Sequence, residues 1–94
     1  MPETVTIMGV PYAVKLVDVV DKTQLCFAQI DYFACEIRID KSLPDERRKV
    51  ALLHDVLHGI CDMLGLEELN NNEGAIQSLA GSLYSTFKGT VIFS

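Results

Sequence analysis

Residues 42–65, SLPDERRKVALLHDVLHGICDMLG, decide the fold, because they predict one long helix in a chain of only 94 residues. Ser42 and Asp45 have the spacing of a capping box, and Pro44 is tolerated in a first helical turn. Gly65 can take the left-handed conformation that ends a helix. We therefore expect a helix that begins near Ser42 and ends at Gly65.

The apolar residues of this helix gather on one side of a helical wheel on which each residue advances by about 100°. The members of this predicted apolar stripe are Val50, Leu53, Leu57, Ile60, Cys61 and Leu64. His54 and His58 fall on its edge, one turn apart, so both imidazoles can point at one metal ion about 2.0 Å from each ring nitrogen. Asp55 falls further round, toward water, where a carboxylate can act on a metal-activated water without binding the metal.

The His-x-x-x-His spacing also has an ordinary explanation. It is common by chance, and two histidines beside an apolar stripe can be hydrogen-bonded core residues. Two observations favour a metal site: an acidic residue directly follows the first histidine, and the chain has no other histidine.

A third metal ligand has to be a carboxylate or a thiolate, because catalytic zinc sites usually have three protein ligands. A second helix is predicted from the asparagines at 70–72 to about residue 88, with a buried face that comprises Ile76, Ala80, Leu83, Tyr84 and Phe87. Glu73 falls in the middle of this face. It is either a metal ligand or the partner of Asn70 in a capping box.

Asp62 is a weaker candidate for the third ligand. It lies one turn after His58, and three ligands in a row on one straight helix span about 12 Å, too far to converge on one ion. We expect Asp62 to orient His58 from outside the ligand set, or to be surface charge. Cys61 points along the apolar stripe and is weaker still.

The first 40 residues predict β-structure. Residues 4–20 predict two strands joined by a turn at Gly9, with Tyr12, Val14 and Leu16 on one face. Residues 24–40 predict a second hairpin with a turn near 31–33. The expected fold class is α+β: one domain over residues 1–94, in which a small antiparallel sheet of three to four strands packs against two or three helices.

The last predicted strand alternates apolar and charged residues from Cys35 to Asp40. If it is an edge strand, its backbone beside Glu36 and Arg38 could bind an extended peptide by strand addition. The alternative is a protected edge whose charged side chains face solvent.

Composition narrows the function classes. The net charge is −5, and the eight Lys and Arg residues form no basic stripe, so we expect no direct binding to nucleic acid. No apolar run approaches the roughly 20 residues that span a bilayer, and no leader sequence opens the chain, which predicts a cytoplasmic protein. Cys26, Cys35 and Cys61 lack metal-site spacing and are predicted to be small buried apolar residues in a reducing compartment.

Three segments together resemble a known family. They are residues 30–40, IDYFACEIRID, residues 38–66, RIDKSLPDERRKVALLHDVLHGICDMLGL, and residues 72–84, NEGAIQSLAGSLY. This set resembles the small phage and prophage members of the ImmA/IrrE-type zinc metallopeptidases, which are minimal gluzincin-like proteins.

The resemblance implies a reduced zincin fold with zinc held by His54, His58 and Glu73. Larger relatives in that family cleave DNA-binding repressors. The implied partner is therefore a protein or peptide substrate, such as a transcriptional repressor in the cytoplasm of a host cell.

The family pattern has glutamate after the first histidine, where this chain has Asp55. The aspartate carboxylate is retracted by roughly 1.5 Å, and a misplacement on the order of 1 Å can cost about 100-fold in rate. Three functions follow: a zinc endopeptidase with Asp55 as general base, a zincin-like regulatory module that binds metal and peptide without cutting, and a metal-free interaction domain.

Overall fold

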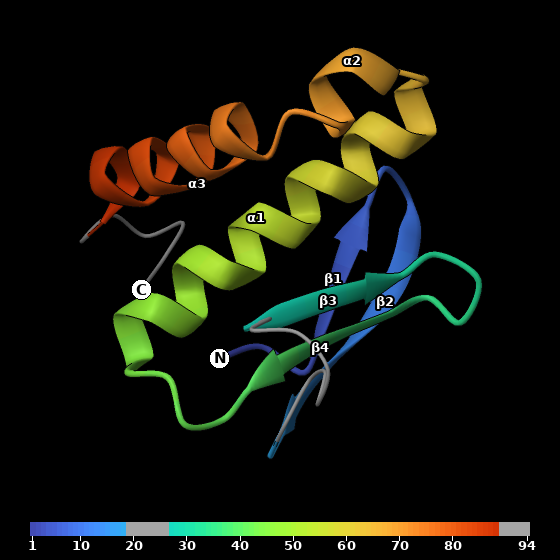
Figure 1. The fold of residues 1–94 in the computed structure, drawn as a ribbon. Helices are drawn as coiled ribbons and strands as arrows, with labels where there is room; N and C mark the ends of the chain where they lie inside the picture. Colours follow the sequence, from blue (N-terminus) through green and yellow to red (C-terminus); the bar gives the residue numbers. More distant parts are fainter. Residues whose placement is uncertain (19–26, 89–94) are drawn as a thin grey trace.

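The protein is built in three layers, which a computed structural model describes for residues 1–18 and 27–88. Within these residues a four-stranded sheet forms the first layer, α1 (Asp45–Leu64) lies across it, and α3 (Glu73–Phe87) packs on the far side of α1 (Figure 1). The short helix α2 (Glu67–Asn70) joins α1 to α3. The predicted α+β class, with a small sheet and two or three helices, is confirmed.

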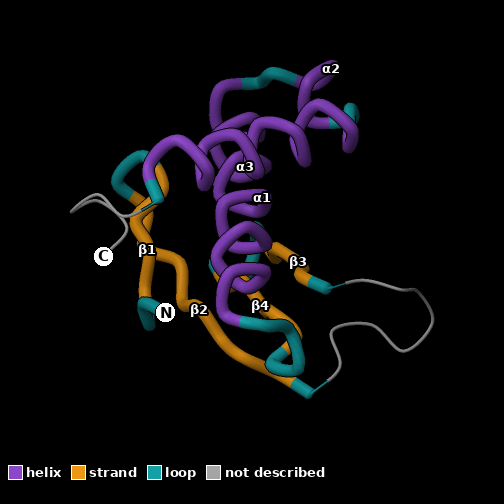
Figure 2. The backbone as a smooth tube through the Cα atoms, turned by 90° about the vertical axis from the view of Figure 1, so that its left-hand side faces the viewer, coloured by secondary structure: helices purple, strands orange, loops and turns teal. Residues whose placement is uncertain are grey.

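The sheet is mixed rather than purely antiparallel. Its strands β1 (Thr4–Ile7), β2 (Val10–Val17), β3 (Ala28–Asp31) and β4 (Glu36–Asp40) are arranged in the order β1-β2-β4-β3. Each hairpin is antiparallel, as expected, but the two hairpins meet through their second strands, and β2 and β4 run parallel. Figure 2 shows β1 and β3 on either side of α1, which therefore crosses the middle of the sheet.

β4 is an interior strand, so the prediction of a peptide-binding edge at Glu36 and Arg38 is wrong. The backbone of β4 pairs with β2 on one side and with β3 on the other. The side chains serve these contacts: Glu36 forms an ion pair with Lys15 of β2, and Arg38 donates a hydrogen bond of 3.0 Å to Gln29 of β3. The edges of the described sheet are β1 and β3.

Both predicted turns are present. Met8 and Gly9 connect β1 to β2 with φ angles of 48° and 86°, the pair of positive values that a two-residue hairpin loop favours. In the second hairpin, Asp31 Oδ1 accepts hydrogen bonds from the backbone N–H groups of Phe33 and Ala34, at 3.0 and 2.9 Å. An aspartate side chain that satisfies the backbone in this way stabilises a tight turn.

The helix α1 ends where the sequence predicts and begins slightly later. Gly65 has a φ of 69° and caps the C-terminus in the left-handed conformation. Pro44, not Ser42, is the N-terminal cap residue, and the predicted capping box does not form. The hydroxyl of Ser42 instead donates a hydrogen bond of 2.8 Å to Oδ1 of Asp40, at the end of β4.

The burial of α1 does not follow the single apolar stripe predicted from the wheel. Its buried residues are Leu52, Asp55, His58, Gly59 and Cys61, and of these only Cys61 belongs to that stripe. The reason is that α1 is a middle layer, covered by the sheet on one side and by α3 on the other. On the sheet side it completes a core formed by Ile7, Tyr12, Ile37, Ile39, Leu43 and Leu52.

Two further sequence predictions concern the cysteines and the membrane. Cys35 and Cys61 are free thiols, and Cys61 is buried, whereas Cys26 and residues 24–26 of the predicted second hairpin lie outside the described residues. Within the described part of the chain, none of the helices combines the length and the apolar character needed to span a bilayer.

Gly59 marks the closest approach of α1 to the sheet. A Cβ atom at this position would lie 2.8 Å from Ile7 Cδ1 and 3.3 Å from Ile30 Cδ1. Ile7 is only 1% exposed, so its side chain has little room to move away. A side chain at position 59 would therefore push the helix away from the sheet.

We expect Gly59→Ala to destabilise the protein by about 1–2 kcal/mol, because overpacking of the core outweighs the gain of roughly 1 kcal/mol in helix propensity. Gly81→Ala in α3 is the matched control, since a Cβ there meets nothing within 4 Å and the propensity gain should appear alone. Urea unfolding of both variants measures the difference. Equal stabilisation by the two substitutions would contradict the close approach.

Candidate metal centre

Two histidines and one glutamate converge between α1 and α3. His54 and His58 lie one turn apart on α1, and Glu73 is the first residue of α3. Nε2 of His54 is 3.0 Å from one carboxylate oxygen of Glu73, and Nε2 of His58 is 3.0 Å from the other. The two Nε2 atoms are 3.2 Å apart. The three predicted ligand groups therefore lie close enough together to hold one metal ion.

The spacing of these atoms fits a tetrahedral ion. Zinc bonds to nitrogen and oxygen are about 2.0–2.1 Å long, which places neighbouring ligands of a tetrahedral site about 3.3 Å apart. The separations of 3.0 to 3.2 Å between the facing atoms are close to this value. Two imidazoles and one carboxylate also form a donor set that occurs in catalytic zinc sites, where a fourth position stays open.

The fold brings Glu73 to the histidines through the short turn around α2. Because α1 and α3 are antiparallel neighbours, the first turn of α3 lies beside the third and fourth turns of α1 (Figure 1). The cap residue of α3 is Asn72, whose side chain accepts a hydrogen bond of 3.0 Å from the N–H of Ala75. The alternative role of Glu73, in a capping box with Asn70, is therefore wrong, and its carboxylate is left to face the histidines.

The other nitrogen of each imidazole is held by an amide oxygen. Nδ1 of His54 lies 2.8 Å from Oε1 of Gln77, and Nδ1 of His58 makes a short hydrogen bond with Oδ1 of Asn70. An amide oxygen can only accept, so Nδ1 of each neutral imidazole carries the proton and Nε2 presents a lone pair. Partners of this kind fix the tautomer and the ring orientation of histidine ligands.

Asn70 and His58 both interact with Tyr32. Tyr32 donates a hydrogen bond of 3.3 Å to the backbone carbonyl of His58. Burial raises the pKa of Tyr32, and a hydrogen bond from Asn70 acts in the opposite direction. The Asn70 side chain thus interacts with both His58 and Tyr32. The predicted role of Asp62 as the group that orients His58 is therefore taken by Asn70.

The electrostatic result is a cluster of acceptors that face one another. Two imidazole lone pairs and one carboxylate point at a common centre, and the amide partners keep both protons on the opposite side of the rings. Such groups repel each other unless a cation or a proton lies between them. The side chain of Glu73 is 69% exposed, whereas both histidines are largely covered, so the cluster opens to solvent on the Glu73 side.

Asp55 lies behind this cluster and is buried, which corrects the prediction that it faces water. The residue is only 3% exposed, and its Oδ2 atom has no hydrogen-bond partner among the described residues. It occupies the sector of α1 between the histidine side and the sheet side, a sector that is closed because the helix is a middle layer. A buried carboxylate without a partner is costly, so this environment disfavours the ionised form of Asp55.

Sequence reasoning missed Asn70 and Gln77 as parts of the site. Gln77 follows Glu73 by one helical turn, so the same wheel that selected Glu73 contains a signal for it. Asn70 gives no such signal, because it lies outside the long helices and its contact with His58 depends on the path of the chain around α2.

Asp55→Asn should change how the stability of the metal-free protein depends on pH. Burial, with a contribution from the negative charge of Glu73, raises the pKa of Asp55 from 3.8 to about 7 in the folded protein. The fold therefore disfavours the ionised form, and stability present below about pH 4 is lost as the pH rises toward 7. Relative to Asp55→Asn, the wild type should lose on the order of 4 kcal/mol of unfolding free energy between pH 4 and pH 8.

Urea unfolding in the presence of a chelator measures this difference at each pH. Asp62→Asn is the matched control, since Asp62 is an exposed aspartate on the same helix, and its curve should run parallel to that of the wild type. A constant difference between the wild type and Asp55→Asn from pH 4 to pH 8 would contradict the buried, unpartnered carboxylate.

Comparison with known proteins adds no relative to this description. The chain matches no protein-family model, no curated protein and no solved structure. Its function is therefore inferred from the geometry of its own side chains.

Proposed function

We propose that the protein is a zinc-dependent metallopeptidase that acts on a protein or peptide substrate. The observation that carries the proposal is the convergence of His54 Nε2, His58 Nε2 and Glu73 on one point, with both Nδ1 atoms held by amide oxygens. A donor set built from three lone-pair groups and supported by two outer partners is suited to a zinc ion.

The residues divide the chemistry between them. Zinc, when bound, supplies Lewis-acid activation of a water molecule and of the scissile carbonyl. His54, His58 and Glu73 would hold the ion, while Gln77 and Asn70 keep the imidazoles in the ligating tautomer. Asp55 is the general base: its carboxylate accepts the proton of the attacking water and returns it to the leaving amine.

The substrate class and location follow the resemblance described above. We propose a regulatory protein, such as a transcriptional repressor, as the substrate, and the cytoplasm as the compartment. The acidic net charge favours recognition of a protein rather than of nucleic acid.

A second candidate function is a zincin-like module that binds metal and peptide but does not cut. The specific observation that favours it is the burial of Asp55, because a retracted carboxylate that is 3% exposed reaches an attacking water less easily than a glutamate does. Both candidates require zinc. The third alternative, a metal-free interaction domain whose histidines are satisfied within the protein, does not.

Zinc binding is the first test. Protein purified without chelator or nickel resin should bind one zinc ion per chain and gain thermal stability with added zinc, by about 2.7 kcal/mol at a free concentration of 100 times Kd. Asn70→Ala should weaken zinc affinity by about 10- to 100-fold, and His54→Ala or Glu73→Ala by more. Asn71→Ala, the exposed neighbour, should leave affinity unchanged.

Competition with a coloured chelator measures these affinities. If the wild type binds no zinc, or binds it as tightly after loss of His54 as before, the metal centre is wrong and the metal-free alternative stands.

Cleavage of a mixed peptide library separates the two zinc-dependent functions. An active peptidase should show cleavage by the wild type that is lost in Asp55→Ala and His54→Ala, whereas a module that does not cut should show none in the wild type. Cleavage that appears only in Asp55→Glu would identify a site disarmed by its shorter carboxylate. Mass spectrometry of the digests gives the readout. If zinc binds but no variant cuts, peptide hydrolysis loses its support.

A further inference from the structure

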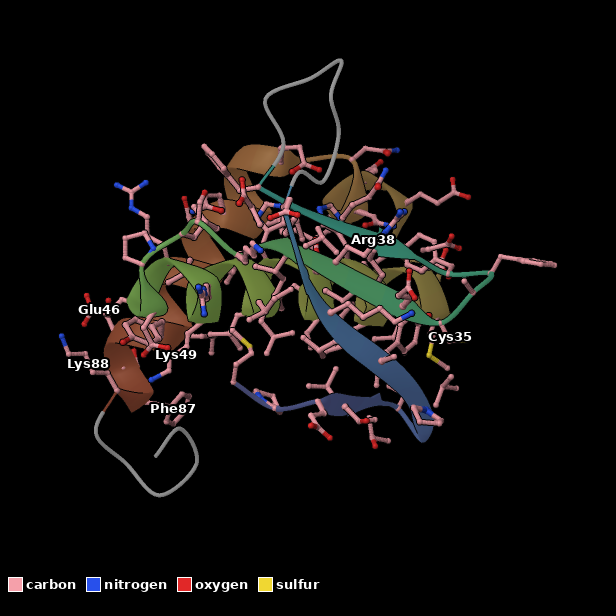
Figure 3. All side chains as sticks on the ribbon, turned by 90° about the horizontal axis from the view of Figure 1, so that it is seen from below. Cys35, Arg38, Glu46, Lys49, Phe87 and Lys88 are labelled. Carbon is pink, nitrogen blue, oxygen red and sulfur yellow. The ribbon has the colours of Figure 1, made fainter. Side chains whose placement is uncertain are left out.

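A groove of about 1040 Å³ runs from the metal centre along α1 and α3. His54, Glu73 and Gln77 line one end of it. The other end lies where α1 begins and α3 ends, and Figure 3 shows Glu46 and Lys88 close together there, at the opposite end of the molecule from Cys35. A molecule that lies in this groove would therefore reach the candidate zinc ligands.

Part of the groove lining is apolar. The apolar lining residues, which come from three parts of the chain, are Phe27, Ala28, Leu43, Val50 and Ala51. At the metal end, the amide oxygen of Gln77 is used by His54, which leaves the amide hydrogens to donate to a ligand carbonyl. A groove that combines a donor for a carbonyl group with apolar side chains suits a peptide that carries an apolar side chain.

The charged end of the groove contains one cation, Arg47, that has no ion-pair partner among residues 1–18 and 27–88. Lys88 is paired with Glu46, at 3.3 Å, and Tyr84 donates to the same carboxylate. Arg47 lines the groove and makes no hydrogen bond or ion pair within the described part of the chain. A guanidinium in a groove of this kind can pair with an anionic group of a ligand.

The charge of the groove favours the same kind of ligand. Two basic and two acidic side chains line it, so their charges cancel, and a divalent ion at the metal end leaves a positive excess in a protein whose net charge is −5. An anionic peptide would therefore be attracted to this groove and repelled by much of the remaining surface.

The distance along the groove sets the position of the anionic group. Arg47 precedes His54 by seven residues of α1, which corresponds to about 10 Å along the helix axis. An extended peptide covers this distance with about three residues.

We propose that the groove binds an extended peptide and that Arg47 selects an acidic side chain about three residues from the scissile bond. The inference rests on the proposed function, since it takes the candidate zinc ligands as the reaction centre. It adds the sequence class of the substrate: an apolar residue near the cut and a Glu or Asp beyond it.

A charge-reversal experiment tests the inference. The zinc-loaded 94-residue chain is mixed with capped ten-residue peptides in which each position in turn is Glu, Gln or Lys. Retained or cut peptides are identified by mass spectrometry. The wild type should prefer Glu to Lys at one position by about fivefold, the upper range for an exposed ion pair. Arg47→Glu should reverse this preference at the same position.

Lys15→Glu is the matched control, because it makes the same change of charge at an exposed residue of β2 outside the groove. It should retain the preference for Glu. Arg47→Glu is expected to fold, since an acidic residue in the first turn of a helix is favourable. Circular dichroism and zinc titration of this variant verify the fold and the metal site.

The outcomes separate the inference from the proposed function. Suppose that the wild type and Arg47→Glu both bind zinc, but prefer the same peptide residue or show no preference. The proposed role of Arg47 is then wrong, while the metal centre stands. If the wild type does not bind zinc in the titration, the proposed function is wrong. The proposal that Arg47 selects an acidic residue of the substrate is then wrong as well.

Discussion

The structure depends on the position of α1 between two other layers. A helix that is covered on opposite sides must pack against the sheet with one set of residues and against α3 with another. Gly59 serves the contact with the sheet, because the absence of a side chain allows α1 to approach Ile7 closely. His54 and His58 serve the contact with α3, since they occupy the side of α1 that α3 covers. Close packing against the sheet thus fixes the direction in which both imidazoles point.

The same arrangement gives the candidate site its electrostatic character. A histidine pair on an exposed helix would be solvated on every side, and each ring could turn. Here Asn70 and Gln77 hold the outer nitrogens, and Glu73 faces the inner ones. Because the supporting groups are neutral amides, they orient the rings without adding charge. The unpartnered carboxylate of Asp55 is then the single buried acidic group of α1.

Local features of the fold could be predicted from the sequence because they depend on neighbouring residues. The turn at Gly9 and the helix end at Gly65 follow from conformations that glycine adopts easily. The strand order could not be predicted in this way, since the parallel pairing of β2 and β4 depends on how two hairpins meet. The supposed edge at Glu36 and Arg38 failed for this reason.

The candidate site also combines features that the sequence predicts with features that it does not predict. Two features could be predicted because they are properties of single helices. They are the spacing of His54 and His58 and the position of Glu73 on the core-facing side of its helix. The burial of Asp55 was not, because a wheel with one apolar stripe cannot represent a helix with two covered sides. The contact of Asn70 with His58 required knowledge of the turn through α2.

One consequence concerns α3, which supplies both Glu73 and one wall of the groove. An ion held by Glu73 and the two histidines would cross-link this wall to α1. Release of the ion would remove this link at the end of the groove where Glu73 lies. The same helix would then connect the binding of a metal ion with the wall that the groove presents to a ligand.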